Sequence, residues 1–424
     1  MTTAVYKKTV LPCGVRVVTE ELPGVRSIAI GVWINVGSRD ERPEENGLSH
    51  FIEHMVFKGT QKRSAAKIAH ELESVGGSLN AFTSREQTCY YARILDRHLE
   101  RAVDVLADIL RHSRFDPQEL EKEKNVIIEE IKDVEDSPGD WVHDFFAENI
   151  WKNHPLGKPI IGHRERIKNF DRSKIVSYLS SKYLAEQVVV AASGNVIHSR
   201  LVALVQSKLS FPSANGASSL NRLAPSDTGE RSFTSKDISQ VHICLGVPSA
   251  SFKDRSRYAC LVLNTVLGSG MSSRLFQKVR EEKALAYTIY SYHDFYEDAG
   301  ILGIYLATSP EQAAPAVELV LDELARIKKE KLPRREFESA KEQLKGNLVL
   351  GLESTSSRMN RLGRNEQVLG EYVSLKQALG VIEAVKPAQV AEQADRLFSE
   401  NRLSAAFLGS LGQEVLGQIN WAKV

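Results

Sequence analysis

The sequence has few cysteines, no long apolar run and no excess of charge of one sign. Its 424 residues include four cysteines, at positions 13, 89, 244 and 260, and none of them forms a C-x-x-C motif. Scattered cysteines of this kind fit small core residues in a protein of a reducing, cytoplasmic-type compartment. No apolar run is long enough to span a membrane, and Lys7 and Lys8 interrupt any N-terminal signal core.

The charge balance excludes further classes of partner. The formal net charge is +1, with 55 Lys and Arg against 54 Asp and Glu, which argues against binding to nucleic acid or to an anionic membrane. Hydrophobic residues make up 42% and charged residues 26% of the chain, as in soluble globular proteins. We therefore expect a cytoplasmic protein of two or three ordinary domains.

The stretch His50-Phe51-Ile52-Glu53-His54 carries the strongest chemical signal. Two histidines four apart on a helix lie on one face, so they can offer two imidazole nitrogens to one metal ion. Glu53 lies beside them and can hold a carboxylate over a metal-bound water. This is the H-x-x-E-H arrangement, the reverse of H-E-x-x-H. A catalytic zinc usually takes three protein ligands and one open position, so a third ligand is required.

The alternative is a polar stripe on a surface helix. The neighbours of the pentad favour the metal. Leu48, Met55, Val56 and Phe57 flank it, and they predict a largely buried helix. Burying two histidines and a glutamate without partners is costly, and a metal is one way to offset that cost.

A second helix supplies carboxylates. Asp116-Pro117-Gln118-Glu119 predicts a strong helix start, with Asp as N-cap, Pro at the first position and Glu closing a capping box. The helix should end near Asp136. Glu123 and Glu130 are seven apart on it and share a face with apolar residues. Most glutamates are surface residues, but these neighbours favour a partly buried carboxylate at Glu130.

The rest of the chain alternates between strand and helix signals. Strands are predicted at 6–11 and 15–19 as a hairpin, then at 27–36 and 187–192. Residues 78–84 and 87–95 are predicted as two strands or as one long strand that bends. Amphipathic helices are predicted at 64–75 and 98–112.

The second half repeats the first at a period of roughly 210 residues. The strand at 239–247, the helix at 259–267, the helix pair at 315–327 and 334–350, and the strand at 403–408 follow the order of the first half. The helix at 259–267 has no His or Glu, and Gly346 falls where Glu130 would be. We predict a domain at 1–206, a linker at 207–229 that is rich in Ser, Pro and Gly, and a homologous domain at 230–424 without the metal ligands.

This pattern resembles the pitrilysin and insulysin family of zinc peptidases, in particular the short bacterial members similar to the catalytic subunit of the mitochondrial processing peptidase. The resemblance covers essentially the whole chain, and the separation from His54 to Glu130 matches the family's spacing. It implies an α+β fold of two homologous domains, each a mainly antiparallel β-sheet flanked by α-helices. It further implies one zinc ion per chain, bound by His50, His54 and Glu130, with Glu53 as general base and Glu123 supporting the ligands from the same helix.

The resemblance also implies substrate-binding residues. The segment from Gly77 to Thr83 looks like the family's substrate-binding edge strand, with contacts from Leu79, Asn80, Ala81, Phe82 and Thr83. The segment from Arg280 to Tyr287 resembles the R-E-K-x-x-L-A-Y-type motif, whose Arg and Tyr assist the substrate, with an Ala at one variable position. An exposed arginine and a core tyrosine are the alternatives for these two residues.

The expected activity is that of a zinc metalloendopeptidase acting on peptides or unfolded polypeptide. Edge-strand pairing reads the backbone, so it suits extended chains of varied sequence. The glycine-rich loop of the mitochondrial non-catalytic subunit is short here, at 267–273. A catalytically inactive assembly protein of the same fold and a hydrolase of non-peptide substrates are the alternatives. Because this chain is about half as long as the single-chain members, we expect a homodimer that takes Arg280 and Tyr287 in trans.

Overall fold

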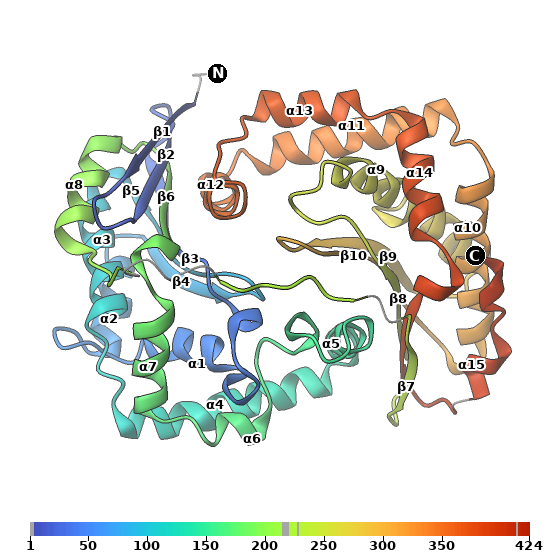
Figure 1. The fold of residues 1–424 in the computed structure, drawn as a ribbon, viewed down its shortest axis with the longest axis horizontal. Helices are drawn as coiled ribbons and strands as arrows, with labels where there is room; N and C mark the ends of the chain where they lie inside the picture. The colour runs from blue at the N-terminus through green and yellow to red at the C-terminus, as the bar shows by residue number, and fades with distance from the viewer. Residues whose placement is uncertain (1–3, 214–219, 227–228, 413) are drawn as a thin grey trace. The chain divides into compact units, whose positions relative to one another are not determined.

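The computed structural model describes residues 4–213, 220–226, 229–412 and 414–424. The chain forms two compact units, each with its own β-sheet and core (Figure 1). The first unit comprises Met1–Lys132, Pro159–Arg222 and Gly351–Val373, and the second comprises Asp133–Lys158, Leu223–Leu350 and Ser374–Val424. No helix among the described residues is both long and apolar enough to cross a bilayer.

The first unit contains a six-stranded sheet in the order β1-β2-β6-β3-β5-β4, antiparallel except for the β2–β6 pair. The strands are β1 (Val5–Val10), β2 (Arg16–Glu21), β3 (Ser27–Ile34), β4 (Ser78–Thr83), β5 (Thr88–Leu95) and β6 (Val188–Gly194). The helices are α1 (Leu48–Met55), α2 (Ala65–Glu73), α3 (Leu99–Arg111), α4 (Pro117–Asp136), α6 (Arg164–Ile167), α7 (Arg172–Lys182), α8 (His198–Lys208) and α12 (Thr355–Val368).

The second unit contains a five-stranded sheet in the order β7-β11-β8-β10-β9, antiparallel except for the β7–β11 pair. The strands are β7 (Arg231–Ser235), β8 (Val241–Pro248), β9 (Thr288–Phe295), β10 (Gly300–Thr308) and β11 (Ser404–Gly409). The helices are α5 (Pro138–Ile150), α9 (Arg257–Gly268), the π-helical η6 (Phe276–Glu282), α10 (Ala313–Lys329), α11 (Arg334–Gly351), α13 (Leu375–Ala384), α14 (Pro387–Leu397) and α15 (Glu414–Gln418). Two mainly antiparallel sheets flanked by helices confirm the predicted α+β class.

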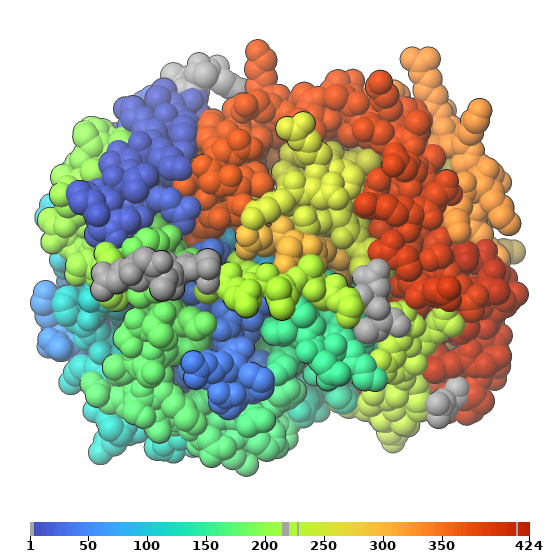
Figure 2. All heavy atoms as spheres, in the orientation of Figure 1, coloured from blue at the N-terminus to red at the C-terminus, as the bar shows by residue number. Residues whose placement is uncertain are grey.

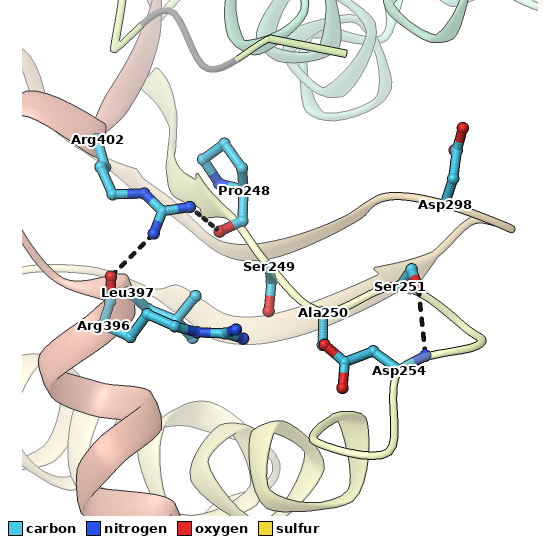
Figure 3. Close-up of a pocket in the computed structure, with 9 residues that line it drawn as sticks. All are labelled: Pro248, Ser249, Ala250, Ser251, Asp254, Asp298, Arg396, Leu397 and Arg402. Atoms are coloured by element: carbon cyan, nitrogen blue, oxygen red, sulfur yellow. Dashed lines mark hydrogen bonds between the residues drawn. The ribbon is translucent and has the colours of Figure 1, made fainter. Parts of the chain in front are cut away.

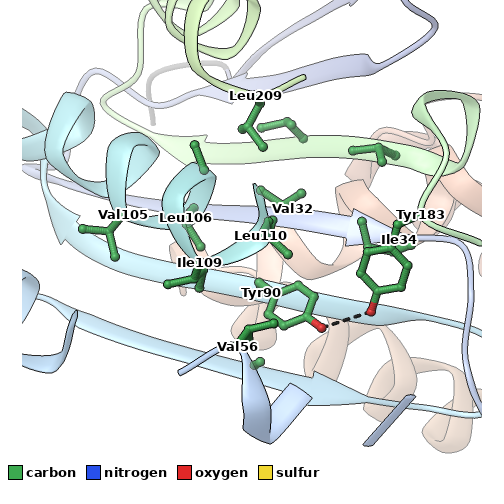
Figure 4. Close-up of a cluster of buried hydrophobic side chains, with 14 of the residues drawn as sticks. Val32, Ile34, Val56, Tyr90, Val105, Leu106, Ile109, Leu110, Tyr183 and Leu209 are labelled. Atoms are coloured by element: carbon green, nitrogen blue, oxygen red, sulfur yellow. Dashed lines mark hydrogen bonds between the residues drawn. The ribbon is translucent and has the colours of Figure 1, made fainter. Parts of the chain in front are cut away.

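Strand β3 explains why its sequence is apolar on both faces. Val32 lies beside Leu106 and Leu110 of α3, and Ile34 lies beside Tyr183 in the same core cluster (Figure 4). On the opposite face, Trp33 packs in a separate buried cluster with residues of α12. A strand buried on both sides has no solvent-facing positions, so its pattern does not alternate.

Helix α12 reaches the first unit from the second half of the sequence, and Figure 2 shows its orange residues against the blue N-terminal strands. The Trp33 indole donates to the Met359 sulfur at 3.3 Å. A Cβ on Gly363 would lie 2.4 Å from the indole nitrogen, so only glycine fits there. In the second unit, α5 from the first half packs on β8 and β11 through Val142 and Phe146.

The predicted halves, 1–206 and 230–424, are continuous in sequence, whereas each compact unit takes a segment from the other half. The predicted linker at 207–229 begins in the last turn of α8, which runs to Lys208. Its residues 214–219 and 227–228 lie outside the described residues.

Candidate metal centre

Helix α1 is anchored by apolar contacts and by a buried carboxylate at its start. Phe51, Ile52 and Met55 are fully buried in the core of the first unit. Glu41 accepts the backbone N–H groups of Gly47 at 2.8 Å and Ser49 at 2.7 Å, so it satisfies two donors that a helix start leaves unpaired. Burial raises the pKa of Glu41 to about 8, against the effect of these N–H groups.

The structure brings His50 and His54 of α1 together with Glu130 of α4. One ligand atom from each lies within 4.8 Å of the others. The two oxygens of Glu130 lie 3.7 Å from His50 Nε2 and 3.7 Å from His54 Nε2. A tetrahedral ion with bonds near 2.1 Å separates its ligand atoms by about 3.4 Å, so small side-chain adjustments would accommodate zinc.

The electrostatic surroundings of the two histidines suit a metal ion. Burial, followed by the nearby His54, lowers the pKa of His50 to about 4, so its imidazole is neutral at neutral pH. The buried Nδ1 of His50 has no hydrogen-bond partner among the described residues. Burial works to lower the pKa of His54, but the hydrogen bond from its ring to the Glu123 carboxylate and the charges of Glu130 and Glu53 raise it. The same negative field favours a metal ion, so the residues present fit zinc.

Glu123 contacts His54 from the side away from Glu130. Its side chain is 4% exposed, and its Oε1 lies 2.8 Å from His54 Nδ1. Its Oε2 lies 2.6 Å from the ammonium of Lys58. The pKa of Glu123 is lowered because the bonds to His54 and Lys58 outweigh burial. A carboxylate on Nδ1 leaves Nε2 of the same ring available to a metal.

Glu53 points to the substrate-binding strand predicted from the sequence. Its Oε2 accepts the hydroxyl of Thr83 at 2.5 Å. Burial raises the pKa of Glu53, although the Thr83 bond and His54 act in the opposite direction. A raised pKa suits a carboxylate that must take up and release a proton near neutral pH.

Strand β4 forms one end of the six-stranded sheet and pairs only with β5 among the described strands. Its outer side therefore offers backbone groups to a further strand. Leu79 packs against the core, Ala81 is buried, and Asn80 is exposed with its side-chain oxygen accepting the N–H of Ala81 at 2.8 Å. Phe82 contacts Trp33 edge to face at 5.5 Å.

Arg280 and Tyr287 lie together in the second unit. The Arg280 guanidinium stacks over Phe276 at 4.8 Å and over Tyr287 at 5.0 Å. Tyr287 is 74% exposed, which rules out the alternative of a core tyrosine. Arg280 lies in the π-helical turn η6, and such turns are frequent at functional sites.

A separate cavity of about 200 Å³ lies in the second unit, and Figure 3 shows the Arg396 guanidinium beside Ser249 and Asp254. Arg402 donates to the backbone oxygens of Arg396 at 2.9 Å and Pro248 at 3.2 Å. None of the residues predicted to be functional lines this cavity.

Sequence reasoning missed Glu41 and Lys58. Lys58 is four residues after His54, so helical spacing could have placed it beside the metal-binding face. Glu41 offered no such signal, because a loop glutamate is normally a surface residue.

Comparisons with known proteins bear on the family of the chain. The family described as "Insulinase (Peptidase family M16)" matches residues 16–164, and "Peptidase M16 inactive domain" matches residues 169–344. The chain is 45% identical over 388 residues to the uncharacterized zinc protease YmxG of Bacillus subtilis, covering 92% of this chain and 94% of YmxG. It is 41% identical over 391 residues to the uncharacterized zinc protease SCO5738 of Streptomyces coelicolor, covering 91% of this chain and 85% of the relative.

A solved structure has the same fold. The crystal structure of a protease from Helicobacter pylori superposes with a TM-score of 0.89 at 22% identity, covering 96% of this chain and 99% of that one. The matched family regions account for most of the chain, and the predicted resemblance to pitrilysin and insulysin is confirmed. The chain belongs to the insulinase family of peptidases, family M16.

Proposed function

We propose that this protein is a zinc-dependent endopeptidase that hydrolyses peptides or unfolded polypeptide segments. The observation that carries the proposal is the arrangement of His50, His54 and Glu130 around one point, with Glu53 beside them. His50, His54 and Glu130 would hold one zinc ion. Zinc bound there supplies Lewis acidity and lowers the pKa of a water toward neutrality.

The remaining steps belong to the protein's own side chains. Glu53 takes the proton of the attacking water and passes it to the leaving amine, which suits its raised pKa. Thr83 orients the Glu53 carboxylate through its hydroxyl. The substrate pairs with the open side of β4, so it must be extended and need not have a fixed sequence. Tyr287 donates to the developing oxyanion, and Arg280 binds a substrate carbonyl or carboxylate.

Metal analysis combined with peptide cleavage tests this function. The purified protein should contain one zinc per chain and cleave unstructured peptides, lose activity to a chelator and regain it with zinc. A protein that folds and binds no zinc would be the inactive assembly protein. Peptides trapped by the Glu53→Gln variant would identify the substrates. The four cysteines are free thiols, as is usual in a reducing compartment, and we place the reaction in the cytoplasm.

We further propose a homodimer in which Arg280 and Tyr287 act in trans. The support is Tyr287, which is 74% exposed and lies beneath the partly exposed Arg280 guanidinium at 5.0 Å. Mixing Glu53→Gln with Tyr287→Phe under conditions of subunit exchange should recover a fraction of wild-type activity, because a mixed dimer regains one complete site. No recovery, with exchange shown independently, would mean that the site is completed within one chain or that Tyr287 has no catalytic part.

A further inference from the structure

Helices α1 and α4 place basic and acidic side chains in an alternating row. Lys58 Nζ lies 2.6 Å from Glu123 Oε2, and Glu123 Oε1 lies 2.8 Å from His54 Nδ1. The row continues from His54 Nε2 to Glu130 at 3.7 Å and from Glu130 to His50 at 3.7 Å. Each acidic group therefore lies between two basic ones, and Lys58 is the end member.

The turn that ends α1 brings Lys58 into this row. The helix ends at Met55, and the backbone N–H of Lys58 bonds to the oxygen of Met55 at 3.2 Å. Gly59 follows with φ of +124°, a conformation that favours glycine, and the chain turns away. Lys58 thus lies about one helical turn after His54, and its ammonium contacts the Glu123 carboxylate, which His54 also contacts.

We propose that Lys58 is a positioning residue of the metal site, which holds Glu123 in the orientation that presents His54 to the metal. This inference rests on the proposed zinc site. Within the described residues the Lys58 ammonium contacts Glu123 and none of the proposed ligands, so Lys58 acts through Glu123.

Two physical arguments support this role. The Glu123 side chain is 4% exposed, so loss of Lys58 would leave one oxygen of a buried carboxylate without its cation, a costly state. The carboxylate could then rotate away from His54. In addition, Glu53, Glu123 and Glu130 carry three negative charges when ionised. A divalent ion would compensate two of them and leave one. Lys58 supplies the matching positive charge.

The test measures zinc affinity, not activity. The dissociation constant is measured by competition with a chromophoric chelator for the wild type, Lys58→Met, Lys58→Arg and the control Lys62→Met, which changes an exposed lysine on the next loop. We expect Lys58→Met to bind zinc about 10-fold more weakly, at the lower end of the effect of outer-shell partners. Lys58→Arg should recover most of the affinity, and Lys62→Met should match the wild type. Equal affinity of Lys58→Met and the wild type would overturn the inference.

A double-mutant cycle shows whether Lys58 acts through Glu123. In a Glu123→Gln background the amide carries no charge for Lys58 to hold. Adding Lys58→Met to that background should therefore weaken zinc binding by less than about twofold. The same loss in both backgrounds would overturn the proposed route. The visible spectrum of the cobalt-substituted proteins should change with Lys58→Met and not with Lys62→Met. Should Lys58→Met fail to fold, Lys58→Gln provides the same comparison.

The outcomes separate this inference from the proposed function. A wild-type protein that binds no zinc overturns both. A wild type that binds zinc, together with a Lys58→Met variant of equal affinity, overturns only the role of Lys58.

Discussion

Helices α1 and α9 occupy corresponding places in the two homologous halves, after strands β3 and β8, yet their surfaces differ. Helix α1 carries His50, Glu53 and His54. Helix α9 has no histidine or carboxylate, and its buried residues, such as Cys260 and Leu263, pack into the core of the second unit. The two helices thus differ in titratable side chains at corresponding places, and in α1 these side chains have charged partners on α4.

Helices α4 and α11 show how the compensation is arranged. Helix α4 buries Glu123 between His54 and Lys58. Helix α11 buries a cation instead, Lys341, whose Nζ donates to the backbone oxygen of Glu383 at 2.9 Å. In the first half the buried charge contacts His54 of α1, and in the second half it joins α11 to α13 of the same unit. Each of these two helices therefore buries one charged side chain, and the two charges have different partners.

The largest effect is expected from replacing Glu53, the proposed general base in the first half. Glu53→Gln should retain zinc and lower peptide turnover by at least about 100-fold, because the amide keeps the shape and cannot accept the proton. Turnover in a chelator-sensitive assay and the zinc content of the same preparation check this. Near-wild-type turnover would show that Glu53 is not the base.

Replacing Glu123 and replacing Glu130 of α4 should affect zinc binding to different extents. Glu130→Gln removes an anionic ligand and should weaken zinc binding most. Glu123→Gln should weaken zinc binding or activity about 10–100-fold. Zinc titration of both variants decides between them. If the Glu123 variant loses its metal and the Glu130 variant keeps it, the two roles are reversed.

The second half should respond to acid without involvement of the metal. His293 is partly buried with its Nδ1 fully covered, its Nε2 lies 2.8 Å from the Ser249 hydroxyl, and burial lowers its pKa to about 3. The unfolded chain therefore binds a proton first as the pH falls. The stability from neutral His293 is fully present above pH 6.5 and is lost toward pH 3, at about 1.4 kcal/mol per pH unit.

Denaturant unfolding of chelator-treated protein across this range checks the prediction. His293→Asn should flatten the pH dependence, and His70→Asn on the exposed face of α2 should not. An unchanged slope in His293→Asn would assign the acid sensitivity to other groups.

The smallest effects are expected in the turns that precede the edge strands β4 and β9. Gly76 precedes β4 with φ of +74°, and nothing lies within 4 Å of a Cβ placed there. Ala284 precedes β9 with φ of +50°, which an L-residue adopts at a cost. Gly76→Ala should lower the free energy of unfolding and Ala284→Gly should raise it, each by about 1 kcal/mol. Thermal unfolding of both variants checks the opposite signs.

Local patterns in the sequence predicted the elements that carry the site. The Asp116-Pro117 start placed α4, which begins at Pro117, and the Asp116 carboxylate accepts the N–H of Gln118 at 2.9 Å. The predicted stretch at 78–95 separated into β4 and β5 at the turn between them. The limits of β3 and α2 are shorter than predicted by one or two residues at their ends, because terminal residues lack a complete set of backbone bonds.

What the sequence determined by itself is the set of residues within one helical turn or one strand: His50, Glu53 and His54 on one face, and Glu123 and Glu130 on another. Helical and strand periodicities are local properties, so they can be read without the fold. Only the tertiary structure decided that Glu41 caps α1, that Lys58 meets Glu123, and that Met359, 326 residues from Trp33, covers the first sheet. Such contacts depend on how distant elements pack, and nothing in the spacing of residues along the chain encodes that packing.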